Sequence, residues 1–68
     1  MEKETEKVLE NIRIKRLEKK WSLLKLANEI GISHSHLYYI EGKKVIPSVD
    51  VFVKIAKALN VNIKDFIE

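Results

Sequence analysis

The sequence contains no cysteine, one proline and two glycines among its 68 residues. Without cysteine the chain has neither a disulfide framework nor a thiolate metal site, so packed side chains must hold it together. No apolar run approaches the roughly 18 residues that a membrane span needs, and no signal-peptide pattern opens the sequence. These absences predict a cytoplasmic protein that makes no contact with a membrane.

The residues that are present favour one small helical domain. Hydrophobic residues make up 46% of the chain, which predicts folding rather than disorder, and 68 residues are too few for two cores. We therefore expect a single domain over residues 1–68, with the polar residues 1–6 frayed. Apolar residues recur at helical spacing, and no strand signal is longer than the run from Val49 to Val53. The predicted class is all-α, a compact bundle of five helices.

The twenty residues from Ser22 to Glu41 indicate two short helices joined by a tight turn. Ser22 and Ser33 each precede an apolar helical pattern and suit the N-cap position. Gly31 can end the first helix in the left-handed conformation, because it has no Cβ. Ala27, four residues earlier, is small enough to let the second helix cross close to the first, as a helix-turn-helix requires. The inward residues would be Leu26, Ala27, Ile30, Ile32, Leu37 and Ile40.

Three further helices are predicted around this pair. The first follows residue 6 and ends near Lys20, with Val8, Leu9, Ile12 and Leu17 inward and Arg16 partly buried. Ser48 caps another, whose apolar positions are Val49, Phe52, Ile55, Ala56 and Leu59. The last is short, from Ile63 to Ile67, with Asn62 and Asp65 spaced as a capping box.

The net charge of +3 is modest but unevenly distributed. Six basic residues and a single acidic one, Glu18, occupy the stretch from Arg13 to Lys25. Such a cluster suits a polyanion such as DNA, although a solvated helix face would also account for it.

Several residues in this register are shared with a known family. They are Arg16, Ser22, Leu26-Ala27, Gly31-Ile32-Ser33, Leu37, Ile40-Glu41, Pro47-Ser48, Lys54 to Leu59, and Val61. From Val8 to Ile67 the chain resembles the lambda Cro and repressor (C1) type of helix-turn-helix domain, the xenobiotic-response-element family. The resemblance implies a lambda-repressor-like fold that binds double-stranded DNA and regulates transcription, in the nucleoid. In such proteins the second helix of the motif lies in the major groove, and dimers place two of them roughly 34 Å apart on a pseudo-palindromic site.

The resemblance also implies which residues contact DNA. His34, Ser35 and Tyr39, with Tyr38 as a fourth, match positions that read bases. Ser22, Leu23, Lys43 and Lys44 match positions near phosphates. Three departures accompany this. Leu23 stands where the family often has Gln, and Gly42 comes one residue before the usual glycine, which puts Lys43 in its place. The adjacent bulky Tyr38 and Tyr39 are unusual in a helix that faces the groove.

Two structural roles follow as well. Arg16 and Glu41 match a pair that the family often joins, and a part-buried guanidinium needs a carboxylate partner. The family often dimerises through its carboxyl end, where apolar residues exceed what one small core needs. The predicted homodimer interface consists of Ile63, Phe66, Ile67, Val45 and Ile46.

The function expected from these residues is that of a repressor bound to its operator as a dimer. The alternative is a protein-interaction module, such as an antitoxin or a regulator's partner, that uses the apolar-aromatic patch Leu23, Leu24, Tyr38 and Tyr39. An enzyme is not expected: no catalytic motif, glycine-rich phosphate loop or small-molecule pocket is evident. His34 and His36 diverge by about 200° on a helix and cannot hold one metal ion together, so no metal or cofactor is expected.

Overall fold

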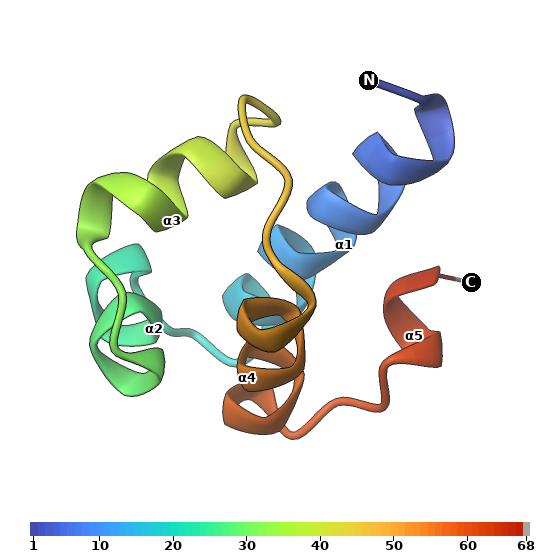
Figure 1. Ribbon diagram of the computed structural model, residues 1–68. Coiled ribbons are helices and arrows are strands. Elements are labelled where there is room, and N and C mark those ends of the chain that lie inside the picture. Colours follow the sequence, from blue (N-terminus) through green and yellow to red (C-terminus); the bar gives the residue numbers. More distant parts are fainter. Residues whose placement is uncertain (68) are drawn as a thin grey trace.

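Five α-helices joined by short loops make up residues 1–67, the part of the chain that the computed structural model describes (Figure 1). The first and longest packs against the third, fourth and fifth, and the second packs against the third and fourth. The predicted all-α class with five helices is confirmed. Their bounds are α1 (Lys3–Glu18), α2 (Leu23–Ile30), α3 (His34–Glu41), α4 (Val49–Leu59) and α5 (Lys64–Ile67).

Serine hydroxyls begin three of these helices. The Oγ atoms of Ser22, Ser33 and Ser48 each accept a hydrogen bond from the backbone N–H three residues on, at 3.0, 3.0 and 3.1 Å. Each bond satisfies one amide that the helix cannot pair by itself, and such a cap contributes about 1 kcal/mol. Gly31 ends α2 with φ of 75°, in the left-handed region. All three caps and the glycine turn are as the sequence predicts.

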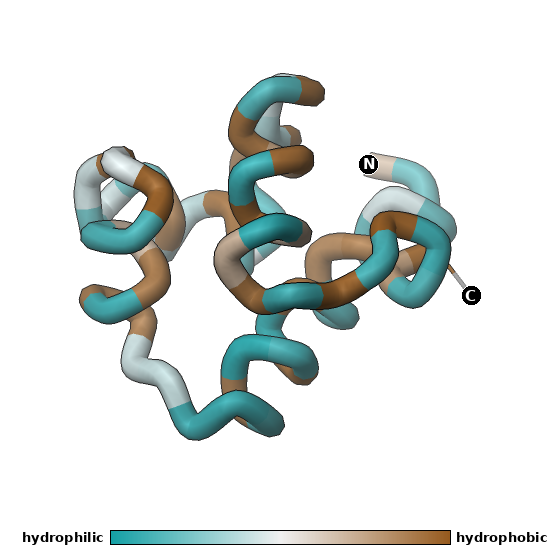
Figure 2. Tube along the Cα trace, turned by 90° about the horizontal axis from the view of Figure 1, so that it is seen from below, coloured by the Kyte–Doolittle hydropathy of each residue, from teal (hydrophilic) through white to brown (hydrophobic). Residues whose placement is uncertain are grey.

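The core lies where the five helices meet. Apolar segments alternate with polar ones along each helix (Figure 2), and every helix contributes at least one buried apolar side chain. Ala27 is completely buried, which allows the close crossing of α2 and α3. The buried apolar residues are Leu9, Ile12, Leu26, Ala27, Ile30, Leu37, Ile40, Ile55, Ala56, Leu59 and Phe66.

Four expectations about the other helices are wrong. Helix α1 begins at Lys3 instead of after residue 6, with acidic residues in its first turn that favour the helix dipole. Leu17 is 46% exposed, because the buried stripe of α1 passes through Arg16 and the next residue turns 100° outward. Helix α5 begins at Lys64, one residue later than expected. The side chain of Asn62 accepts from the backbone N–H of Lys64 and forms a turn, not a capping box with Asp65.

Candidate nucleic-acid interface

Helix α3 has one face in the core and another in solvent. Leu37 and Ile40 are fully buried and hold the helix against the rest of the domain. The predicted base-contacting residues lie on its solvent side, since all four are exposed: His34, Ser35, Tyr38 and Tyr39. Imidazole and hydroxyl groups both donate and accept hydrogen bonds, so this side offers the chemistry that reads base edges.

The two tyrosines form the largest aromatic surface on α3. Tyr38 is 62% exposed and Tyr39 is 50% exposed, and their rings meet edge to face with centroids 5.8 Å apart. Exposed apolar side chains that lie together, as these two do, are typical of interaction surfaces. A tyrosine ring can pack on a thymine methyl while its hydroxyl contacts a base or a phosphate.

The amino end of α2 lies beside α3. The Ser22 hydroxyl is committed to the N–H of Lys25, at 3.0 Å, so the serine acts as a cap. The first amide groups of an α-helix have no partner within the helix and can donate to an anion. Leu23 is half-buried against the core, whereas Leu24 is exposed. This end of α2 could therefore offer backbone donors, with Leu23 as a packing residue in place of a polar contact.

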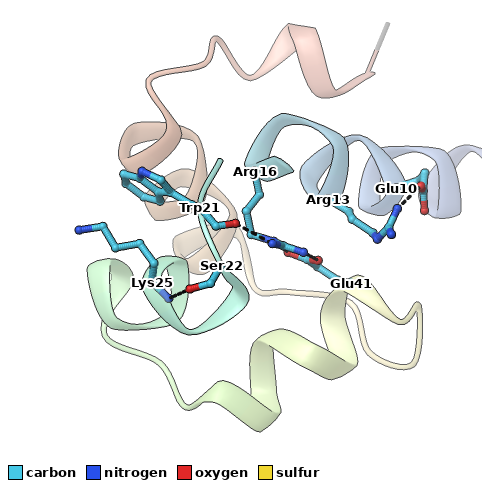
Figure 3. A network of polar contacts seen from close by, with 7 residues as sticks. All are labelled: Glu10, Arg13, Arg16, Trp21, Ser22, Lys25 and Glu41. Carbon is cyan, nitrogen blue, oxygen red and sulfur yellow. Dashed lines mark hydrogen bonds and ion pairs between the residues drawn. The ribbon is translucent and has the colours of Figure 1, made fainter. Parts of the chain in front are cut away.

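A buried ion pair joins α1 to the end of α3 (Figure 3). Arg16 donates from Nε and Nη2 to the two carboxylate oxygens of Glu41, both at 2.8 Å. Its remaining nitrogen, Nη1, donates to the backbone oxygen of Trp21 at 2.8 Å, in the loop before α2. One guanidinium thus connects α1, the loop before α2 and the last residue of α3. The pair between Arg16 and Glu41 is the one that the sequence predicts.

The loop after α3 carries the two lysines expected at phosphates. Gly42 has an ordinary helical φ of −77°, and Lys43 takes the left-handed conformation with φ of 63°. The shifted glycine therefore leaves a lysine where the backbone favours glycine. The Lys43 Nζ lies 3.2 Å from Oε1 of Glu10 on α1, whereas Lys44 is exposed. In the free protein the two lysines thus have different surroundings.

An open hollow of about 440 Å³ lies between α1, the amino end of α2 and the carboxyl end of α3. It is lined by Arg13 and Arg16 of α1, by Leu23 of α2, by three residues at the end of α3, and by Gly42 and Lys44 in the loop that follows. The α3 residues are Tyr38, Tyr39 and Glu41. Arg13 was not singled out as a site residue from the sequence. Arg13 lies three residues before Arg16, which places both on one side of α1. This spacing is the feature of the sequence that predicts Arg13 beside Arg16.

The comparisons with known proteins agree with this geometry. Residues 12–66 match the family model described as "Helix-turn-helix". The chain belongs to this family. The crystal structure of a hypothetical transcription factor, NHTF, from Neisseria is similar to it with a TM-score of 0.85 and 28% identity, over 94% of this chain and 75% of that one. Among curated proteins, none matches the sequence.

The predicted resemblance to Cro/C1-type domains is therefore confirmed, and the chain is a helix-turn-helix DNA-binding domain of the transcription-factor type. The family consists of DNA-binding domains and not of enzymes. Within the described residues, no three histidine, cysteine or acidic side chains lie close enough to hold a metal ion. No helix among residues 1–67 is long and apolar enough to cross a bilayer.

The residues predicted at a dimer interface of the helix-turn-helix domain do not all reach the surface. Phe66 is completely buried, and the centroid of its ring lies 5.5 Å from the centroid of the Phe52 ring. It cannot belong to an interface between copies, because the short helix α5 points this side chain inward to close the monomer. The other four are exposed: Val45, Ile46, Ile63 and Ile67.

Proposed function

We propose that this helix-turn-helix domain binds a specific double-stranded DNA site through α3 and represses transcription there by excluding polymerase. The observation that carries the proposal is the division of α3. Its apolar residues Leu37 and Ile40 are wholly buried, while the side with Ser35 and Tyr39 is free for a groove. An α-helix fits the width of the major groove, where the base edges are distinguishable.

The surroundings of α3 supply groups for the DNA backbone. Phosphates beside the groove would meet the amino end of α2 at Ser22 and Leu23, and the lysines Lys43 and Lys44. Contacts of this kind set the position of the protein without reading sequence. They also release counterions, so affinity should fall as salt rises.

Two copies would bind a pseudo-palindromic operator. One domain presents a single eight-residue helix to DNA, which offers few base contacts. Exposed Ile67 and Ile63, with Val45 and Ile46, provide apolar surface for a homodimer. Dimeric relatives place two recognition helices about one DNA turn apart, roughly 34 Å.

The direct test is a titration with fluorescent duplex DNA. Wild-type protein should bind random duplex more weakly as salt increases, and selection from random oligonucleotides should yield one preferred sequence. Tyr39→Ala and Ser35→Ala should each weaken binding to that sequence about tenfold. Tenfold is about 1.4 kcal/mol, within the roughly 1–3 kcal/mol that a good base contact contributes. Asn28→Ala, exposed on α2, is the control and should bind as wild type.

The second candidate is a protein-interaction module, favoured by the exposed apolar and aromatic residues Leu24, Tyr38 and Tyr39. Together with Leu23 they would form a docking patch for a regulatory protein. Absence of binding to any duplex DNA at low salt would favour this candidate over the first.

A further inference from the structure

The carboxylate of Glu10 on α1 is held by two cations from different parts of the chain. Its Oε2 lies 3.4 Å from Nη1 of Arg13, one helical turn away (Figure 3). Its Oε1 lies 3.2 Å from Nζ of Lys43, in the loop after α3. All three side chains are between one-third and one-half exposed, and ion pairs this exposed contribute at most about 1 kcal/mol to folding. Stability therefore does not account for the arrangement.

Both cations lie at the edge of the proposed DNA-binding face. Arg13 lines the hollow together with Tyr39 and Lys44, and Lys43 follows α3 after a single residue. The neighbouring guanidinium, that of Arg16, is fully engaged by Glu41 and Trp21. Arg13 and Lys43 are thus two cations near the end of α3, and both form ion pairs with Glu10 in the free protein.

The backbone at Lys43 adds an independent observation. Its φ of 63° is in the left-handed region, which costs a residue with a Cβ roughly 1 kcal/mol relative to glycine. The same conformation follows α1 at Lys20 and ends α4 at Asn60, so Lys43 is the left-handed residue that closes α3. Glycine would relieve the strain but would remove the ammonium group from this place.

We propose that Glu10 is an internal competitor for DNA phosphate. Its carboxylate occupies Arg13 and Lys43 in the free protein, and a backbone phosphate takes these cations over when DNA binds. Carboxylate and phosphate oxygens bind guanidinium and ammonium groups by the same charge-assisted hydrogen bonds, so one can replace the other. Glu10 would then lower affinity for DNA of every sequence, since the cations must be released and a negative charge stays near the phosphates.

This inference rests on the proposed function, and it is tested with Glu10→Gln in the intact chain. The probe is random duplex DNA, titrated at several salt concentrations from about 50 to 200 mM, where each phosphate contact changes the slope of log K against log salt by about 0.9. Glu10→Gln should bind about three- to tenfold more tightly than wild type at the lowest salt. The difference should shrink as salt rises, because both proteins form the same phosphate contacts and the charge that Glu10 leaves near the phosphates is screened.

Glu18→Gln is the matched control. Glu18 is also on α1 and also pairs with a basic residue one turn away, Lys15 at 3.6 Å. The change in net charge and the loss of a pair within α1 are therefore matched, and only Glu10→Gln also loses a pair with Lys43. It should stay within about twofold of wild type, as expected for a charge outside the interface. In the Glu10→Gln background, Lys43→Gln and Arg13→Gln should each remove part of the gain.

The outcomes separate the two proposals. Equal tightening by Glu10→Gln and Glu18→Gln would show a net-charge effect and overturn the role of Glu10. Unchanged or weaker binding by Glu10→Gln, with its melting transition intact, would overturn it too. A wild-type protein that binds no duplex at about 50 mM salt, where phosphate contacts are strong, would overturn the proposed function and this inference with it.

Discussion

The guanidinium of Arg16 and the carboxylate of Glu41 form a bidentate pair across 25 residues of sequence, with both bonds at 2.8 Å. Their side chains are only 9% and 5% exposed. Planar two-bond geometry fixes direction as well as distance. Because Glu41 is the last residue of α3, this pair sets how the proposed recognition helix is held against α1.

Glu41→Ala should lower stability strongly. It leaves the buried Arg16 charge without a partner, and breaking a buried pair in this way costs about 3–5 kcal/mol. Urea unfolding followed by circular dichroism measures the loss, and binding to the selected DNA should fall in parallel.

Two further variants test this interpretation. Glu29→Ala removes an exposed carboxylate 3.1 Å from Lys25 and should cost no more than about 1 kcal/mol. The double variant Arg16→Met with Glu41→Leu replaces the pair by apolar side chains and should recover most of the stability. If Glu41→Ala unfolded at the same urea concentration as Glu29→Ala, the pair would have no structural role.

Gly31→Ala should destabilise the domain by about 1 kcal/mol, through the backbone alone. The glycine has φ of 75°, and a Cβ built there meets no atom within 4 Å, so crowding adds nothing. Gly31→Asn should lose less, because asparagine tolerates the left-handed conformation better. Thermal melts should give the highest melting temperature for the wild type, a lower one for Gly31→Asn and the lowest for Gly31→Ala.

Lys43→Gly should stabilise the domain and weaken its binding to DNA. Relief of the left-handed strain is worth about 1 kcal/mol and is offset in part by the lost pair with Glu10 and by the greater freedom of glycine when unfolded. We expect a melting temperature a few degrees higher. Lys44→Gly, at a residue without positive φ, is the control and should not raise it. A lower melting temperature for Lys43→Gly would contradict the claim that the left-handed backbone at Lys43 destabilises the domain.

Ile67→Lys should dissociate the proposed homodimer without unfolding the monomer. This side chain is 60% exposed, so a charge there disturbs only an interface with another copy. Light scattering gives the oligomeric state, and Lys54→Ala on α4 is a surface control. Truncation after Asn62 is unsuitable, because it removes the buried ring of Phe66. If wild-type protein is already a monomer at all concentrations tested, the dimer proposal fails.

Sequence reasoning was most accurate where contacts are local. The serine caps and the left-handed Gly31 depend on residues within four positions of each other, so their identities and spacing suffice. The two sides of α3 also follow from spacing alone, since Tyr38 and Tyr39 come one and two residues after the buried Leu37, which turns them about 100° and 200° away from it. The DNA-binding class depended on matching these local signals to a family.

Errors and omissions arose where distant segments meet. The start of α5 was predicted one residue early, and nothing in Phe66 itself distinguishes a core residue from an interface residue. Its complete burial in the folded domain, where α5 packs against α1, settles its place. The exposure of Leu17 likewise depends on which stripe of α1 the other helices cover.

By itself, then, the sequence determined the helices, their caps, the turn at Gly31 and the outward side of α3, because period and capping act over a few residues. Tertiary structure alone decided that Phe66 closes the core and that Glu10 meets Lys43 across 33 positions of chain. Such contacts depend on how rigid helices pack in three dimensions, and no local pattern encodes that packing.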